Sequence, residues 1–130
     1  MSRPRETTRH RAIARDVQHE IAQNYRDPDF ALDDVAPAIG ISERQLQRVL
    51  RAQTGLTFRE TLLAYRMIRA RAMLERGMAA RVVARRVGYR QASGLGQAFK
   101  RFYNEPPSAA HPPPPNYDHE WREREIGYQG

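Results

Sequence analysis

The chain contains no cysteine. This absence excludes a disulfide framework, a zinc site with cysteine ligands and a catalytic thiol. No apolar run approaches the length of a membrane span, and the first residues lack the apolar core of a signal peptide. We therefore expect a cytoplasmic protein that does not engage a membrane.

The sequence also lacks the patterns of a β-sheet and of an enzyme. No segment shows a convincing strand alternation, and His111 and His119 have no partner ligands near them for a metal. The adjacent carboxylates Asp33 and Asp34 fit helix capping better than acid–base catalysis. We expect an all-α protein that is not an enzyme, with no catalytic residues, no metal and no cofactor.

Positive charge is what the chain has in excess. Its 130 residues carry a formal net charge of +7, the pI is near 10.5, and arginine dominates the cations. Such an excess indicates an acidic partner, either nucleic acid or an anionic membrane surface. Arginine in particular suits bidentate contacts with phosphate and guanine.

Two segments about fifty residues apart share one pattern, over residues 34–51 and 83–101. In each, a short apolar segment ends in an aliphatic residue and a glycine, and an amphipathic segment with glutamine and cations follows. Gly40 and Gly88 suit the tight turn between two crossing helices, because glycine enters positive φ without a steric cost. The repeat predicts two helix-turn-helix units, and in a basic chain it indicates duplex DNA.

Capping and breaker residues give the expected helix bounds. Ser42 with Gln45, and Thr57 with Glu60, read as capping boxes. We expect about seven short helices and locate six of them, over residues 6–25, 33–39, 42–55, 57–76, 80–87 and 91–103. The expected buried side of the long helix comprises Phe58, Leu62, Tyr65, Ile68, Ala72 and Leu74.

Four regions follow from these bounds. Residues 1–56 hold the N-terminal helix and the first helix-turn-helix, residues 57–77 the linker helix, and residues 78–110 the second helix-turn-helix. Residues 111–130 begin with a proline run and continue as a short polar tail. We expect this last region to be flexible.

The linker helix and the second unit carry a resemblance to a known family. Phe58, Arg66-Met67, Ala70 and Leu74 match the family's linker-helix pattern, and residues 83–102 match its most specific stretch. On these residues the chain resembles the DNA-binding domain of the AraC/XylS family, in which a long helix bridges two helix-turn-helix units. The resemblance implies a sequence-specific transcriptional regulator that binds successive major grooves of double-stranded DNA.

Few residues precede the first unit, so the chain is similar to the small stand-alone members of the MarA, SoxS and Rob kind. That similarity implies a monomer without a small-molecule effector domain, regulated by its abundance. It also implies an asymmetric DNA site, and action either by contact with RNA polymerase or by blocking it.

The two recognition helices supply the candidate DNA contacts. Arginine pairs with guanine O6 and N7, and glutamine with adenine N6 and N7, so both suit base reading in a major groove. The candidate base readers are Arg44, Gln45, Gln47, Arg48, Ser93 and Gln97. The candidate phosphate contacts are Ser42, Arg51, Arg90, Gln91, Lys100 and Arg101. The arginines of the linker helix, Arg59, Arg66, Arg69, Arg71 and Arg76, are expected mostly to aid solubility.

The second recognition helix departs from the family pattern at Gly94 and Gly96. Each interior glycine costs about 1 kcal/mol of helix stability, and neither offers a hydrogen-bonding side chain. We therefore expect the first unit to do most of the base reading. Two alternatives stay open: a non-specific architectural DNA-binding protein, or an adaptor that uses the helix-turn-helix surface to bind an acidic protein.

Overall fold

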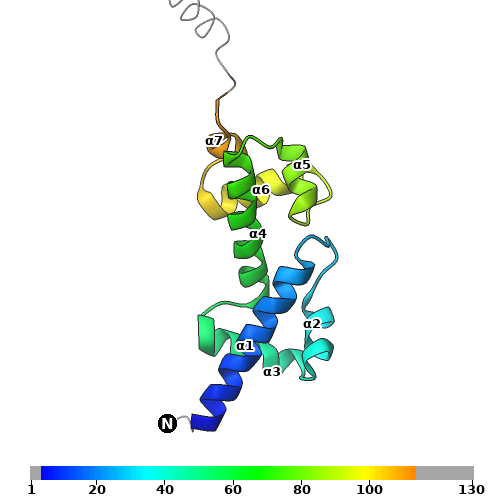
Figure 1. The fold of residues 1–130 in the computed structure, drawn as a ribbon, viewed down its shortest axis with the longest axis vertical. Helices are drawn as coiled ribbons and strands as arrows, with labels where there is room; N and C mark the ends of the chain where they lie inside the picture. The colour runs from blue at the N-terminus through cyan, green and yellow to red at the C-terminus, as the bar shows by residue number, and fades with distance from the viewer. Residues whose placement is uncertain (1–3, 114–130) are drawn as a thin grey trace, which may run out of the picture.

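The computed structural model of the protein describes residues 4–113, which form helices joined by short loops and contain no strand (Figure 1). The helices are α1 (Pro4–Asn24), α2 (Leu32–Ile39), α3 (Glu43–Thr54), α4 (Phe58–Glu75), α5 (Ala80–Arg86), α6 (Ala92–Tyr103) and α7 (Pro107–Ala110). The all-α prediction is confirmed. The predicted flexible tail lies outside the described residues from residue 114 onward.

Helix α4 connects two groups of helices that lie at opposite ends of the molecule in Figure 1. We call α1–α3 the first unit and α5–α7 the second unit. In the first unit α3 packs against α1 and α2. In the second unit α6 packs against α5 and α7, and it also packs against the linker helix α4. Helix α7 was not located from the sequence. It is a single turn that begins at Pro107, where the fixed φ of proline suits the first helical position.

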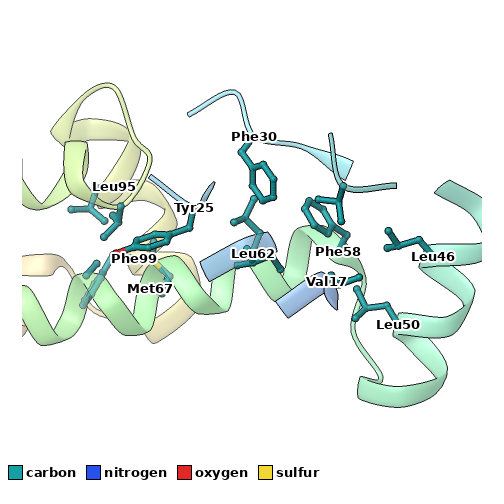
Figure 2. Packing of buried hydrophobic residues seen from close by; sticks show 14 of the residues in the cluster. Val17, Tyr25, Phe30, Leu46, Leu50, Phe58, Leu62, Met67, Leu95 and Phe99 are labelled. Carbon is teal, nitrogen blue, oxygen red and sulfur yellow. The ribbon is translucent and has the colours of Figure 1, made fainter. Parts of the chain in front are cut away.

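One hydrophobic core runs along α4 through both units (Figure 2). At the end near the first unit, Val17 and Leu46 are fully buried and Phe58 is 1% exposed. At the other end, Leu95 and Phe99 of α6 are fully buried. Each unit therefore fixes its recognition helix by apolar burial against its own end of the same core.

The predicted buried side of α4 was wrong at two positions. Ile68 is 60% exposed and Ala72 is exposed, whereas Arg66 is only 9% exposed. The buried positions recur every fourth residue from Phe58 to Leu74, which places Arg66 on the buried stripe. Residues 68 and 72 each come two positions after a residue of that stripe, about 200° around the helix, and so point to the opposite side.

Two of the predicted helix caps need correction. Helix α2 begins at Leu32, so Asp33 and Asp34 lie in its first turn, and the Asp34 carboxylate accepts from the Ala31 N–H at 2.9 Å. Ser42 caps α3 by accepting from the backbone N–H of Gln45 at 3.1 Å, but the Gln45 side chain does not complete a capping box.

The capping box at the start of α4 is confirmed in both directions. The Thr57 hydroxyl accepts from the Glu60 N–H at 3.2 Å, and the Glu60 carboxylate accepts from the Thr57 N–H at 3.3 Å. These bonds satisfy two backbone donors that a helix start leaves without partners.

Candidate nucleic-acid interface

The turns of the two units have the same backbone geometry. Gly40 has φ 83° and Gly88 has φ 93°, a region that side chains with a Cβ disfavour. In the first turn the Ile41 N–H donates to the Ala36 carbonyl at 3.1 Å, and in the second the Tyr89 N–H donates to the Ala84 carbonyl at 2.8 Å. These bonds end the first helix of each pair in the same way, so the sequence repeat is a structural repeat.

Helix α3 presents a basic face opposite its buried side. Arg44, Arg48 and Arg51 are exposed, and their spacing of four and three residues puts them on one side of the helix. Ser42 is exposed at the N-cap, and Gln45 is half-buried. Four of the predicted contact residues of this unit are thus accessible to a ligand, and Gln45 is so in part.

Gln47 has a partner that sequence reasoning did not foresee. Its side chain is half-buried, and its Oε1 accepts from the backbone N–H of Phe58 at 3.0 Å. That N–H belongs to the first turn of α4 and has no partner within the helix. Gln47 therefore joins α3 to the start of the linker helix, while its role in base reading stays a prediction.

The exposed face of helix α6 has fewer cations than that of α3. Gln91, Ser93, Gln97, Lys100 and Arg101 are exposed. Gln91 is the N-cap residue but makes no side-chain capping bond, and its Oε1 instead accepts from the Ser93 hydroxyl at 3.4 Å. Asn104 ends the helix with φ 60°, as expected for a residue that tolerates the left-handed conformation.

An open cleft of about 770 Å³ separates the first unit from α6. Its lining includes Gln47 of α3, Arg59 and Leu62 of α4, and Gln97 and Arg101 of α6. Candidate base readers of both units therefore border one cleft. Arg59, expected mostly to aid solubility, is exposed at this cleft and adds a cation that sequence reasoning did not assign to the interface.

The cations of both recognition faces are free of ion pairs. Within residues 4–113 the ion pairs are Arg71–Glu75 and Arg90–Asp29. None of the other candidate cations, Arg44, Arg48, Arg51, Lys100 and Arg101, takes part in an ion pair in that part of the chain. Their charge is available to an anionic partner.

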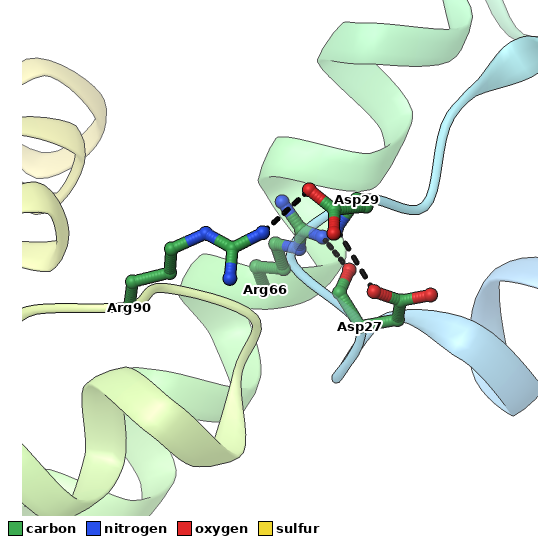
Figure 3. A network of polar contacts seen from close by, with 4 residues as sticks. All are labelled: Asp27, Asp29, Arg66 and Arg90. Atoms are coloured by element: carbon green, nitrogen blue, oxygen red, sulfur yellow. Dashed lines mark hydrogen bonds and ion pairs between the residues drawn. The ribbon is translucent and has the colours of Figure 1, made fainter.

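Arg90 differs from those cations. Its Nη2 lies 2.6 Å from Oδ1 of Asp29, although both side chains are largely exposed (Figure 3). The hydrogen bond with Asp29 raises the pKa of Arg90. To meet a phosphate, Arg90 would have to share or exchange this partner.

Arg66 is the residue that sequence reasoning misjudged most. Its Nε donates to the Tyr25 carbonyl at 3.0 Å and its Nη2 donates to the Asp27 carbonyl at 2.9 Å. Its guanidinium also lies 5.6 Å from the ring centre of Tyr89. Burial lowers the pKa of Arg66, while Tyr89 and Asp27 raise it. The four-residue spacing from Phe58 was the signal that could have found its buried position.

No helix in the described part of the chain is both long and apolar enough to cross a membrane.

Comparison with known proteins agrees with this geometry. A family model described as a helix-turn-helix domain matches residues 35–111. The HTH-type transcriptional regulator RipA of Corynebacterium glutamicum is 33% identical over 77% of this chain. The match covers 33% of RipA, so the chain spans about a third of the length of this curated relative.

Solved structures show the same fold. The C-terminal domain of AraT, a response regulator from Geobacillus stearothermophilus, is 25% identical with a TM-score of 0.74, and the alignment covers 81% of this chain and 89% of that one. The DNA-binding domain of AdpA, solved in complex with a target DNA, is 24% identical with a TM-score of 0.67, covering 85% and 94%. The prediction of two helix-turn-helix units on a linker helix is confirmed.

Proposed function

The chain belongs to the AraC/XylS family of helix-turn-helix transcriptional regulators, and we propose that it reads duplex DNA by placing α3 and α6 in successive major grooves. The observation that carries this proposal is the repeat of one turn geometry in a single chain, with cations on the exposed face of each recognition helix that form no ion pair in the part of the chain that the structure describes. Successive major grooves on one face of a duplex are about 34 Å apart.

The proposed roles follow from side-chain chemistry and exposure. Arg44 and Arg48 read guanine edges in the first groove, because their side chains are exposed and take part in no ion pair within the described residues. Arg51 in the first unit, and Lys100 and Arg101 in the second, meet phosphates and set the register of the protein on the duplex.

Two further residues fit phosphate contacts. The Ser42 hydroxyl uses an acceptor site for its cap, and its O–H remains free to donate to a phosphate. Arg59 lies at the cleft between the two recognition helices, where the backbone between successive major grooves would pass. Gln45, Ser93 and Gln97 supply the remaining base contacts, and Gln91 a further phosphate contact.

The presence of two recognition helices in one chain supports binding as a monomer. Because their exposed faces differ, the preferred site would be asymmetric. Regulation would then follow from contact with RNA polymerase or from blocking its access, in the cytoplasm where bacterial DNA lies.

A non-specific architectural role is the second candidate, favoured by the composition of α6. Its first two turns carry Ala92, Gly94 and Gly96, which offer no side-chain hydrogen bonds to a base edge. If α6 contacts only the backbone, specificity rests on the first unit alone.

Selection of binding sites from a random duplex library tests these candidates. A selected consensus that binds at least about a thousandfold more tightly than random duplex supports specific regulation. A ratio near one would identify an architectural protein, and no binding to any duplex would leave the adaptor role.

The affinity should fall steeply with salt. Arg51, Arg59, Lys100, Arg101 and their neighbours provide about six phosphate contacts, so log K should fall against log [salt] with a slope of about −5. Fluorescence anisotropy between low and high salt measures the slope. A slope near zero would remove the electrostatic basis of the proposal.

A further inference from the structure

Outside α4 itself, one group of polar contacts ties the first unit to the second. We call it the inter-unit junction: Arg66, the loop residues Asp27 and Asp29, and Arg90 (Figure 3). The loop follows α1 of the first unit, Arg66 comes from the middle of α4, and Arg90 lies in the turn between α5 and α6. Three parts of the fold therefore meet here.

The turn of the second unit packs closely against the Arg66 guanidinium. A Cβ on Gly88 would lie 2.7 Å from both Nε and Nη2 of Arg66 and would also collide with the Tyr25 carbonyl. Glycine at this turn thus allows the second unit to approach the arginine and the end of α1 closely. The ring of Tyr89 then covers the guanidinium from the second unit.

Beside the junction the two units are held apart by the open cleft of about 770 Å³. Side chains across an open cleft do not resist a change in the angle between the units. The junction does, because its hydrogen bonds are to two backbone carbonyls and are charge-assisted.

We propose that Arg66, supported by the Asp29–Arg90 ion pair, is a positioning residue that fixes the angle between the two recognition helices and thereby the half-site spacing that the protein accepts. The effect on half-site spacing rests on the proposed function, whereas the effect on the angle between the helices does not. Inserting one base pair moves the second half-site by about 3.4 Å and rotates it by about 35°. A protein with a fixed angle cannot follow that change.

The first test measures the angle without DNA. Because the chain has no cysteine, Ala52→Cys on α3 and Ala109→Cys on α7 accept spin labels selectively, and both positions are exposed. In the full chain, electron–electron distance measurements should give one narrow distribution. Arg66→Lys should broaden it, because a single ammonium cannot span both carbonyls as the guanidinium fork does.

Arg69→Lys is the matched control. It makes the same change on the same helix, where Arg69 is exposed and donates to the Tyr65 hydroxyl within α4. Its distribution should stay narrow. A distribution that stays narrow in folded Arg66→Lys would overturn the proposal.

The second test measures spacing. The unmodified protein should lose about tenfold or more in affinity when one base pair is inserted between the half-sites of its selected site, the equivalent of losing one base contact. Arg66→Lys should reduce that loss severalfold, and Arg69→Lys should preserve it. If the unmodified protein selects no site, the proposed function fails while the distance measurement still judges the junction.

Asp29→Asn keeps the proposal testable if Arg66→Lys does not fold. Asp29 is exposed, so its substitution leaves the core intact, and it weakens the outer contact with Arg90. It should broaden the distance distribution less than Arg66→Lys does. If only this variant folds and its distribution and spacing preference match those of the unmodified protein, the junction does not fix the angle.

Discussion

The recognition helices of the first and second units are equal in length, but they begin differently and expose different side chains. Ser42 caps α3 through its hydroxyl, whereas Gln91 at the same place in α6 provides no cap. The exposed face of α3 carries three arginines. Helix α6 has two glycines in its first two turns, and its cations lie only in its last turn. The same turn geometry therefore presents one helix face whose side chains suit contacts with base edges and another whose side chains suit contacts with the DNA backbone.

The units also differ in how their turns are surrounded. A Cβ on Gly40 would meet no atom within 4 Å, whereas one on Gly88 would collide with Arg66 and the Tyr25 carbonyl. The first turn thus needs glycine only for its positive φ. The second turn needs it also for the close approach at the inter-unit junction.

The largest expected effect comes from testing this difference directly. Gly40→Ala should lower the free energy of unfolding by about 1–2 kcal/mol, the cost of a Cβ at positive φ. Gly88→Ala should lower it by about 2–5 kcal/mol, because overpacking against the Tyr25 carbonyl and Arg66 adds to the same strain. Urea denaturation of both variants measures the gap, and equal losses would show that the second turn relaxes freely.

The next largest effect is expected from substitutions of candidate base readers, which should differ between the two units. Arg48→Ala should cost about 1–3 kcal/mol in binding to the selected site and relax the preference at one or two base pairs. Gln97→Ala should change specificity less, because α6 has fewer groups that act with it. Binding isotherms on the selected site and on random duplex give both numbers.

Lys100→Ala is the control for backbone contact and should weaken binding to both DNAs alike. The division of roles is reversed if Gln97→Ala abolishes discrimination while Arg48→Ala leaves it intact.

The local features of the fold were predictable from the sequence because they depend on neighbours in the chain. Gly40, Gly88 and the amphipathic segment that follows each of them were enough to place both turns and both recognition helices. Short-range patterns gave the bounds of the six predicted helices within a few residues, although the N-cap of α2 is Ala31 and not an aspartate.

The contacts between units were not predictable, because they join residues far apart in sequence. Arg66 bonds to carbonyls 41 and 39 residues away, and Asp29 pairs with a residue 61 positions on. No periodicity records a side chain that donates to a distant backbone carbonyl. The contact of Gln47 with the Phe58 N–H was missed for a similar reason, since that N–H belongs to the start of the next helix.

The helix starts offer a smaller test of the comparison. Ser42→Ala should lower the free energy of unfolding by about 1 kcal/mol, because the Gln45 N–H loses its partner. Gln91→Ala should change it little, because no capping bond is lost. Gln91→Ser should gain a few tenths of a kcal/mol if its hydroxyl caps α6. Thermal melts of the three variants decide whether the second helix lacks a cap in solution.

A change of at most similar size, in the stabilising direction, is expected at the two glycines within α6. Gly96→Ala should raise the free energy of unfolding by about 1 kcal/mol, because alanine is the better helix former and its Cβ meets no atom within 4 Å. Gly94→Ala should gain less, because its Cβ would lie 3.3 Å from Cδ1 of Tyr89 and that ring must move. Affinity for the selected site then shows why the glycines are there. If Gly96→Ala stabilises the fold and binds DNA unchanged, the second face tolerates a side chain and the glycine adds nothing to recognition. If it stabilises the fold but weakens binding, the helix backbone approaches the duplex closely at this position, and the second unit contacts DNA through its backbone where the first unit uses arginine side chains.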